Sequence, residues 1–193
     1  MSTALDTWID AIRLEEKTCP WAGPRPIQAD DPGYFLVGRE DDTSRFGQAV
    51  ERNKLVVLEG DSGVGKTSLL QRALVPRLEK MGFVVAVCRD WKDDPNLTGD
   101  DGTLFLARRV HDALAKGSDP TLSERHAPDD SLFETIEEEY GSRFVIVLDQ
   151  FEELMRVSEH RSNQIISRVL DINKFLQTKV VISLRSEYVH RLR

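Results

Sequence analysis

A short stretch in the first third of the chain has the residue types and spacing of a polyphosphate-binding loop. It reads GDSGVGKT over residues 60–67 and satisfies the pattern G-x-x-x-x-G-K-[ST]. Its glycines let the backbone curl so that successive N–H groups point inward around a phosphate, and a helix starting near Lys66 adds the positive end of its dipole. Lys66 would supply a charge for the β- and γ-phosphates, and the Thr67 hydroxyl would be a Mg²⁺ ligand. The residues expected to bind the phosphates of a nucleoside triphosphate in this way are Gly60, Asp61, Ser62, Gly63, Val64, Gly65, Lys66, Thr67 and Ser68.

An acidic residue that could complete the site lies in the stretch RFVIVLDQFEEL, residues 143–154. Asp149 follows five apolar residues, so its carboxylate should emerge at the carboxyl end of a buried strand, where α/β sheets bind ligands. It is the expected second Mg²⁺ ligand, bound directly or through water. Either Glu152 or Glu153 could orient the water that attacks the γ-phosphate, and the other would belong to a charged first turn favoured by the helix dipole. Gln150 could position a water, although an amide is no general base.

A cation is expected at the same edge of the sheet. The stretch SLRSEY, residues 183–188, places Arg185 at the end of another apolar strand. A guanidinium there could report the presence of the γ-phosphate or stabilise charge in the transition state. An ordinary ion pair with Glu187 or with surface acids is the alternative role.

These side chains need strands and helices that bring them to one edge, and the hydrophobic pattern predicts an alternation of the two. The expected strands cover 54–60, 83–91, 143–149 and 179–185, and the expected helices cover 66–80, 103–116, 131–140 and 161–177. A polar, helix-like stretch covers 39–52, and a polar loop separates the two middle helices. Strands that are apolar at every position are buried on both faces, as parallel strands covered by helices must be. The sequence therefore predicts an α/β three-layer sandwich with a mainly parallel sheet and right-handed crossovers.

The N-terminal region differs in composition from this core. Residues 3–12 have the apolar spacing of a short helix with a capping box, which would pack on the chain's own core or dock on a partner. The stretch CPWAGPRPIQADDPGY, residues 19–34, contains four prolines and two glycines and is typical of an extended connection. We therefore divide the chain into a helix and proline-rich lead-in, residues 1–33, and a nucleotide-binding core, residues 34–193.

Composition argues against several classes of protein. The 193 residues carry a net charge of −7, which disfavours nucleic acid as the main partner because nonspecific nucleic-acid binders have a basic surplus. The chain lacks a run of about 18 apolar residues and a secretory signal, so no membrane association is expected. Two cysteines, Cys19 and Cys88, are too few and too scattered for a disulfide framework or a zinc site. Reduced thiols in a cytoplasmic protein are the favoured interpretation.

With these residues identified, the sequence resembles the signal-transduction ATPases with numerous domains (STAND NTPases), and among them the bacterial group called novel STAND NTPase 1. The resemblance covers roughly residue 19 to the end and rests on the blocks CPWAGPRPIQADDPGYFLVGRE, GDSGVGKTSLL, VIVLDQFEEL and VVISLRSEY. It implies a P-loop NTPase sheet of order 5-1-4-3-2 and a switch in which ATP binding and slow hydrolysis control an oligomer and a linked effector. It also implies that Val37 and Arg39 lie near the base and ribose, and that Arg185 senses the γ-phosphate. A role in prokaryotic defence or stress signalling is a further implication of the resemblance.

Members of that family continue past the arginine strand into a fifth strand, a helical lid and a winged-helix-like module, whereas this chain ends at Arg193. In the sheet order above, the first strand would then be an unpaired apolar edge, which invites pairing or aggregation. We therefore expect a core that is incomplete at its C-terminus, as a fragment or one partner of a split assembly. Self-association, or a partner effector or sensor domain, is expected with it.

Two other functions fit the same motifs. The chain could hold ATP or ADP as a structural or regulatory module without hydrolysis, because an open site keeps water around the phosphates and weakens every charge contact. A phosphotransferase is the other alternative, since the region 92–130 could bind an acceptor. A GTPase is disfavoured because NKFL, residues 173–176, has leucine where a guanine-reading motif needs aspartate, and TIEEEYGSRF, residues 135–144, is unlike the signature segment of an ABC ATPase.

Overall fold

The computed structural model describes residues 40–91, 101–117, 120–129 and 131–192. The predicted N-terminal helix and proline-rich lead-in lie outside these ranges, as do Val37, Arg39 and Cys19.

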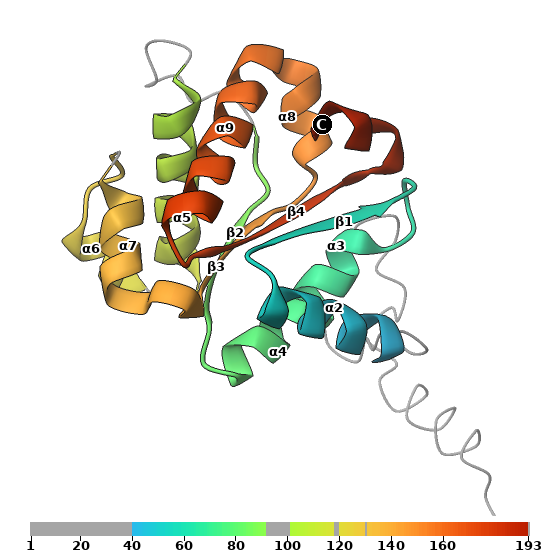
Figure 1. Ribbon diagram of the computed structural model, residues 1–193, viewed down its shortest axis with the longest axis horizontal. Coiled ribbons are helices and arrows are strands. Elements are labelled where there is room, and N and C mark those ends of the chain that lie inside the picture. Colours follow the sequence, from blue (N-terminus) through green and yellow to red (C-terminus); the bar gives the residue numbers. More distant parts are fainter. Residues whose placement is uncertain (1–39, 92–100, 118–119, 130, 193) are drawn as a thin grey trace, which may run out of the picture.

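A parallel sheet of four strands forms the centre of the described part of the chain (Figure 1). Its strands are β1 (Leu55–Gly60), β2 (Val84–Cys88), β3 (Phe144–Leu148) and β4 (Lys179–Arg185), and their order across the sheet is β1-β4-β3-β2. This order confirms the predicted 5-1-4-3-2 arrangement without its fifth strand. Because all four strands run in the same direction, their carboxyl ends, and the loops that follow them, lie along one edge of the sheet.

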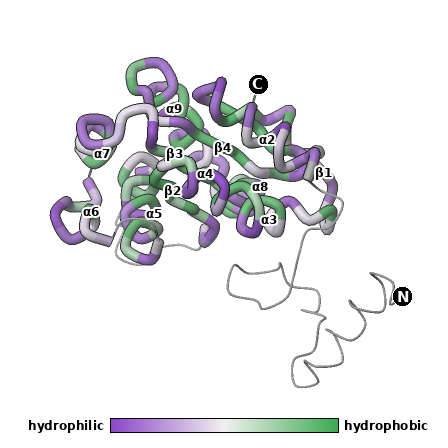
Figure 2. Tube along the Cα trace, turned by 90° about the horizontal axis from the view of Figure 1, so that it is seen from below, coloured by the Kyte–Doolittle hydropathy of each residue, from purple (hydrophilic) through white to green (hydrophobic). Residues whose placement is uncertain are grey.

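Helices cover both faces of this sheet. One face carries α2 (Glu40–Arg52), α3 (Lys66–Leu69), a π-helical segment η1 (Leu70–Leu74) and α4 (Val75–Lys80). The other carries α5 (Gly102–Lys116), α6 (Pro120–Arg125), α7 (Leu132–Tyr140), α8 (Phe151–Val157) and α9 (Glu159–Phe175). Two short 3₁₀ segments, η2 (Gly141–Arg143) and η3 (Ser186–Leu192), lie before β3 and after β4. Figure 2 shows hydrophobic residues gathered on the inner elements, while the outer turns of α6 and α7 are hydrophilic.

The alternation of side chains along β3 explains the three layers. Val145 and Val147 join the core beneath α2, η1 and α4, whereas Ile146 and Leu148 join the core beneath α5 to α9. Every residue of β3 is buried, as predicted for a strand covered on both faces. β1 differs, because it pairs only with β4 among the described residues and leaves Val57 39% exposed, as expected for a first strand at the edge of the sheet.

The helix predicted over 66–80 is present but is not uniform. The Val75 N–H donates to the Leu70 carbonyl, five residues back, which widens one turn into a π-helix. Pro76 follows at once and has neither an N–H to donate nor room for a tight preceding turn. The wider turn therefore lets the helix continue past a proline and keeps Lys66 and Thr67 on the same helical segment as the buried Leu78.

The polar loop predicted between the two middle helices contains a helix that the pattern did not indicate. In α6, Pro120 occupies the first position, where its missing N–H costs nothing, and Leu122 is fully buried. His111 Nε2 lies 2.9 Å from the Ser123 carbonyl oxygen and 3.1 Å from that of His126. Since a carbonyl can only accept, this nitrogen carries the proton and ties α6 to α5.

None of the helices in the described ranges combines the length and the apolar character that crossing a membrane requires.

Candidate functional site

The glycine-rich loop between β1 and α3 has the backbone that its sequence predicts. Gly63 and Gly65 have φ angles of 80° and 86°, in the left-handed region that residues with a Cβ adopt at a cost. Gly65 is the last residue before the helix, and its carbonyl accepts from the Leu69 N–H at 2.9 Å. The helix N-terminus therefore faces the concave side of the loop, where its unpaired N–H groups favour an anion.

Lys66 lies at the base of this loop. Its Nζ donates to the Gly60 carbonyl oxygen at 2.7 Å and to the Asp61 carbonyl oxygen at 2.9 Å. These contacts keep the ammonium within the curve of the loop. An ammonium has three donors in a compact group, so it can exchange backbone acceptors for phosphate oxygens with a small movement.

The two predicted metal ligands meet, although 82 residues separate them in the sequence. Thr67 Oγ1 donates to Asp149 Oδ1 at 3.3 Å, and both residues are buried. Thr67 follows β1 and Asp149 follows β3, and β4 lies between these two strands. The contact therefore spans β4 near its carboxyl end. The other carboxylate oxygen, Asp149 Oδ2, is buried and has no hydrogen-bond partner among the described residues. An unsatisfied carboxylate oxygen beside a threonine hydroxyl is a donor set that suits a hard divalent cation.

Burial raises the pKa of Asp149, and several neighbours oppose this shift. The Thr67 hydroxyl, the Ser183 hydroxyl, the Arg89 charge and the Gln150 N–H each lower the pKa. The Ser183 hydroxyl makes no hydrogen bond of ordinary geometry within the described residues, so it acts on the carboxylate as a nearby dipole. Desolvation dominates, and a carboxylate in this setting gains from a cation that replaces its lost water.

The turn after Asp149 has an uncommon backbone. Gln150 has φ 54° and is the one non-glycine residue with positive φ in the described ranges. Its N–H donates to Asp149 Oδ1 at 3.0 Å, while the Asp149 N–H donates to the Cys88 carbonyl at 2.8 Å. The second bond extends the β2–β3 ladder by one residue, so the aspartate is fixed to the end of the sheet.

The two glutamates that follow are placed differently. Glu152 is 4% exposed, whereas Glu153 is exposed, so of the two only Glu152 faces the interior of the protein. Glu152 Oε1 lies 3.3 Å from Arg185 Nε, and its Oε2 is buried without a hydrogen-bond partner in the described part of the chain. Arg185 Nη1 also lies 3.9 Å from Glu187 Oε1. Arg185 pairs with Gly60 in the register of β4 and β1, which places it beside the start of the phosphate loop.

Three neighbours of Asp149 escaped the sequence-based reasoning. Ser183 lies on β4, next to the aspartate by extension of the β3–β4 register, and it is fully buried. Arg89 follows β2 and acts on Asp149 electrostatically. Trp91 is buried and donates its indole N–H to the Asp149 carbonyl at 2.7 Å. A polar residue inside the apolar run VVISLR was the one available signal, for Ser183.

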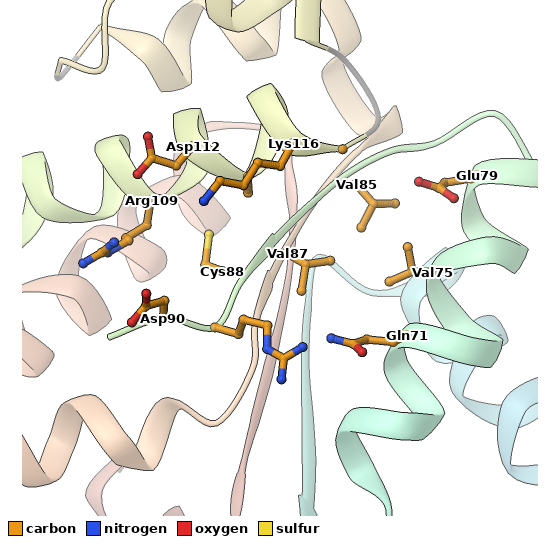
Figure 3. Close-up of a pocket in the computed structure, with 13 residues that line it drawn as sticks. Gln71, Val75, Glu79, Val85, Val87, Cys88, Asp90, Arg109, Asp112 and Lys116 are labelled. Carbon is orange, nitrogen blue, oxygen red and sulfur yellow. The ribbon is translucent and has the colours of Figure 1, made fainter. Parts of the chain in front are cut away.

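A cavity of about 480 Å³ borders this site along β2 (Figure 3). Helix α5 lines one side of it, and η1 and α4 line the other. Arg89 lines it at the end near Asp149, and Gln71 lines it one helical turn after Thr67. Cys88, also in the lining, is a buried free cysteine, and burial raises its pKa to about 12, so its thiol stays protonated.

A metal held wholly by protein ligands does not fit. The described residues contain no group of three or more histidine, cysteine, aspartate or glutamate side chains that could hold an ion. Mg²⁺ commonly takes one or two protein oxygens and completes its shell with water and substrate phosphates. The pair Thr67 and Asp149 fits that mode of binding.

Comparison with known proteins agrees with this fold. The family described as Novel STAND NTPase 1 matches residues 20–193. Among solved structures, a Walker-type ATPase of Pyrococcus abyssi is similar in fold, with a TM-score of 0.54 and 16% identity over 83% of this chain and 47% of that chain. This chain therefore corresponds to less than half the length of that ATPase. No curated protein matches the chain.

Proposed function

Because the chain belongs to the Novel STAND NTPase 1 family, a family of nucleotide-binding NTPases, we propose that it binds Mg²⁺–ATP, hydrolyses it slowly and acts as a nucleotide-dependent signalling switch. The observation that carries this proposal is the contact between Thr67 Oγ1 and Asp149 Oδ1 at 3.3 Å, at the mouth of the glycine-rich loop. It joins the phosphate-binding half of the site to the acidic half.

The roles of the site residues follow from their positions. The loop from Gly60 to Ser68 would surround the β- and γ-phosphates with backbone N–H groups, and Lys66 would exchange its backbone acceptors for phosphate oxygens. Thr67 and Asp149 would hold Mg²⁺, which when bound neutralises charge on the phosphates. Burial raises the pKa of Asp149 because it removes water from the carboxylate, and a bound cation would offset this loss of hydration.

Glu152 is the better candidate for orienting the attacking water. It is buried at the edge of the site and has an unpartnered Oε2, whereas Glu153 points to solvent. Arg185 would leave Glu152 and Glu187 for the γ-phosphate, where its charge would stabilise the transition state. When the γ-phosphate is present, Arg185 would therefore no longer hold the Glu152 carboxylate, which could then orient water.

Calorimetric titration of ADP and ATP, with and without Mg²⁺, tests binding. We expect uptake that Mg²⁺ strengthens, and we expect Lys66→Ala to abolish it, because the loop then lacks its one ammonium. Lys80→Ala is the matched control, since Lys80 is exposed at the end of α4 and the substitution removes the same charge. Absence of uptake by folded parent protein would refute the proposed function.

A module that binds nucleotide without turnover is the second candidate. The ion pair between Glu152 and Arg185 favours it, because a carboxylate held by a guanidinium cannot also orient water freely. A single-turnover assay with bound ATP separates the two candidates. The ATPase is supported if the parent hydrolyses bound ATP and Glu152→Gln slows this hydrolysis without weakening binding. The module without turnover is supported if no ADP forms over hours.

The switch also predicts partners. We propose that ATP favours self-association or contact with an effector or sensor domain, in a cytoplasmic signalling or defence pathway of a prokaryote. Light scattering after gel filtration, in ADP and in ATP with the Glu152→Gln variant, measures the first of these. A mass that does not depend on nucleotide would contradict control of self-association.

A further inference from the structure

We propose that Trp91 is a positioning residue for the Asp149 carboxylate. Its indole N–H would hold the turn that aims Asp149 at Thr67, and so set how strongly Mg²⁺ supports nucleotide binding. This inference rests on the proposed function and adds a residue that lies outside the phosphate loop and the acidic strand.

The contact itself is short and buried. Trp91 Nε1 donates to the Asp149 carbonyl oxygen at 2.7 Å, and Trp91 is 3% exposed. The bond joins the end of β2 to the end of β3, over 58 residues of sequence. The Asp149 carbonyl is the first group after the β3 ladder, so without this donor it would be a buried acceptor with no strand partner.

The turn at this carbonyl needs such support. Gln150 has φ 54°, a conformation that residues with a side chain adopt at a cost and keep only where their surroundings hold them. The Gln150 N–H in turn donates to Asp149 Oδ1 at 3.0 Å, so the turn and the carboxylate orientation depend on each other. If the peptide group between Asp149 and Gln150 rotated away from Trp91, the Gln150 N–H would move with it. Its hydrogen bond to Asp149 Oδ1 would then break.

The indole is itself held by an aromatic cluster made of Trp91, Phe105 and Phe151. The rings of Trp91 and Phe151 meet edge to face with centroids 5.5 Å apart, and those of Trp91 and Phe105 lie 6.5 Å apart. Phe105 belongs to α5 and Phe151 opens α8, so two helices hold the ring that carries the N–H.

The result is an aspartate with one uncommitted polar atom. Its N–H donates to Cys88, its carbonyl accepts from Trp91, and its Oδ1 accepts from Thr67 and Gln150. Oδ2 alone has no hydrogen-bond partner among the described residues. Oδ2 is thus the atom through which Asp149 would hold a cation, and Trp91 contributes a bond from a side chain outside the loop and the turn.

The test compares Trp91→Phe with Phe105→Leu. The first keeps a ring and removes the N–H, whereas the second disturbs the aromatic cluster and leaves the Asp149 carbonyl bonded. The ADP dissociation constant is measured for each in EDTA and in saturating Mg²⁺. Loss of one buried hydrogen bond corresponds to about tenfold in an equilibrium constant. We expect Trp91→Phe to lose about that much of the gain from Mg²⁺ while its affinity in EDTA stays within about twofold of the parent.

We expect Phe105→Leu to retain the parent's gain from Mg²⁺. Equal losses in the two variants, or a full gain in Trp91→Phe, would overturn the positioning role while leaving the proposed function intact. Failure of the parent to bind ADP at all would instead overturn the proposed function.

A measurement without nucleotide decides the contact independently. Hydrogen exchange followed by NMR should show a slowly exchanging Trp91 indole proton, assigned by its disappearance in Trp91→Phe. The Gln150 amide should exchange about tenfold faster in Trp91→Phe, since its bond to Oδ1 is loosened. An indole proton that exchanges at the rate of a solvent-exposed group, or an unchanged Gln150 amide, would refute the inference.

Discussion

Removal of the Arg185 guanidinium should destabilise the protein, and the geometry of its ion pair with Glu152 sets limits on the loss of stability. Arg185→Met keeps most of the aliphatic stem and removes the charge, which leaves the buried Glu152 carboxylate without its partner. At the observed Nε–Oε1 distance of 3.3 Å, the attraction is about 1 kcal/mol in water and about 5 kcal/mol at an effective dielectric constant of 20.

The exposures of the two side chains narrow this range. The side chain of Glu152 is 5% exposed and that of Arg185 is 37% exposed, so solvent screens the guanidinium but hardly reaches the carboxylate. We expect a loss of about 2 kcal/mol in the free energy of unfolding, or about 4–8 °C in Tm for a chain of this size. Urea denaturation at pH 7 measures the first quantity, and calorimetry measures the second.

A double-mutant cycle separates the pair from other effects of each substitution. The double variant Arg185→Met with Glu152→Gln has no buried charge left unpaired, so it should be more stable than Arg185→Met alone. The coupling energy should fall in high salt, because the pair is reached by solvent on one side. A coupling below about 0.5 kcal/mol, or an unchanged urea midpoint in Arg185→Met, would refute the assignment of a held ion pair.

Other predictions concern the loop and the aspartate. Gly63→Ala and Gly82→Ala each force a Cβ into left-handed backbone with open space around it, so both should cost roughly 1–2 kcal/mol of stability, but only Gly63→Ala should weaken ADP binding in calorimetry. Burial raises the pKa of Asp149, so the folded protein holds this proton to higher pH than the unfolded chain does, and the ionised carboxylate lowers stability at neutral pH. Asp149→Asn should therefore have the higher Tm at pH 7 without Mg²⁺, with a difference that shrinks as the pH falls from the raised pKa toward the ordinary aspartate pKa and is gone below it, and an equal Tm at pH 7 would contradict this. Added Mg²⁺–ADP should raise the Tm of the parent and not that of Lys66→Ala, and an equal rise in both would contradict the role of Lys66.

The parts of the fold with a strong hydrophobic pattern could be predicted from the sequence. The runs around β3 and β4 are apolar at nearly every position, and only a sheet covered on both faces buries such strands. The phosphate loop could be predicted for a different reason, since its left-handed positions require the glycines at 63 and 65. The helix boundaries follow the pattern less closely, since α9 begins two residues before the predicted start at 161 because Ser158 caps it there.

Features that depend on tertiary contacts could not be predicted. α6 has one buried apolar side chain, Leu122, which is too few for a helical pattern. The pairing of Glu152 on α8 with Arg185 at the end of β4 depends on the directions of the two side chains, which the expected strand order does not fix. Trp91 gave no signal either, because an isolated tryptophan after a strand is usually part of a core, and here it is both a core residue and a hydrogen-bond donor.

The placement of β4 between β1 and β3 limits what can occupy its tip. Two strands that flank a third lie about 10 Å apart, which leaves space above the middle strand for an ion and part of its water shell. Ser183, two residues before the end of β4, lies beside Asp149 by extension of the β3–β4 register, is fully buried, and is among the smallest side chains that offer a hydroxyl. A leucine or phenylalanine at position 183 would put hydrocarbon where a hydroxyl now lies beside the Asp149 carboxylate, so either substitution should weaken the effect of Mg²⁺ on nucleotide binding.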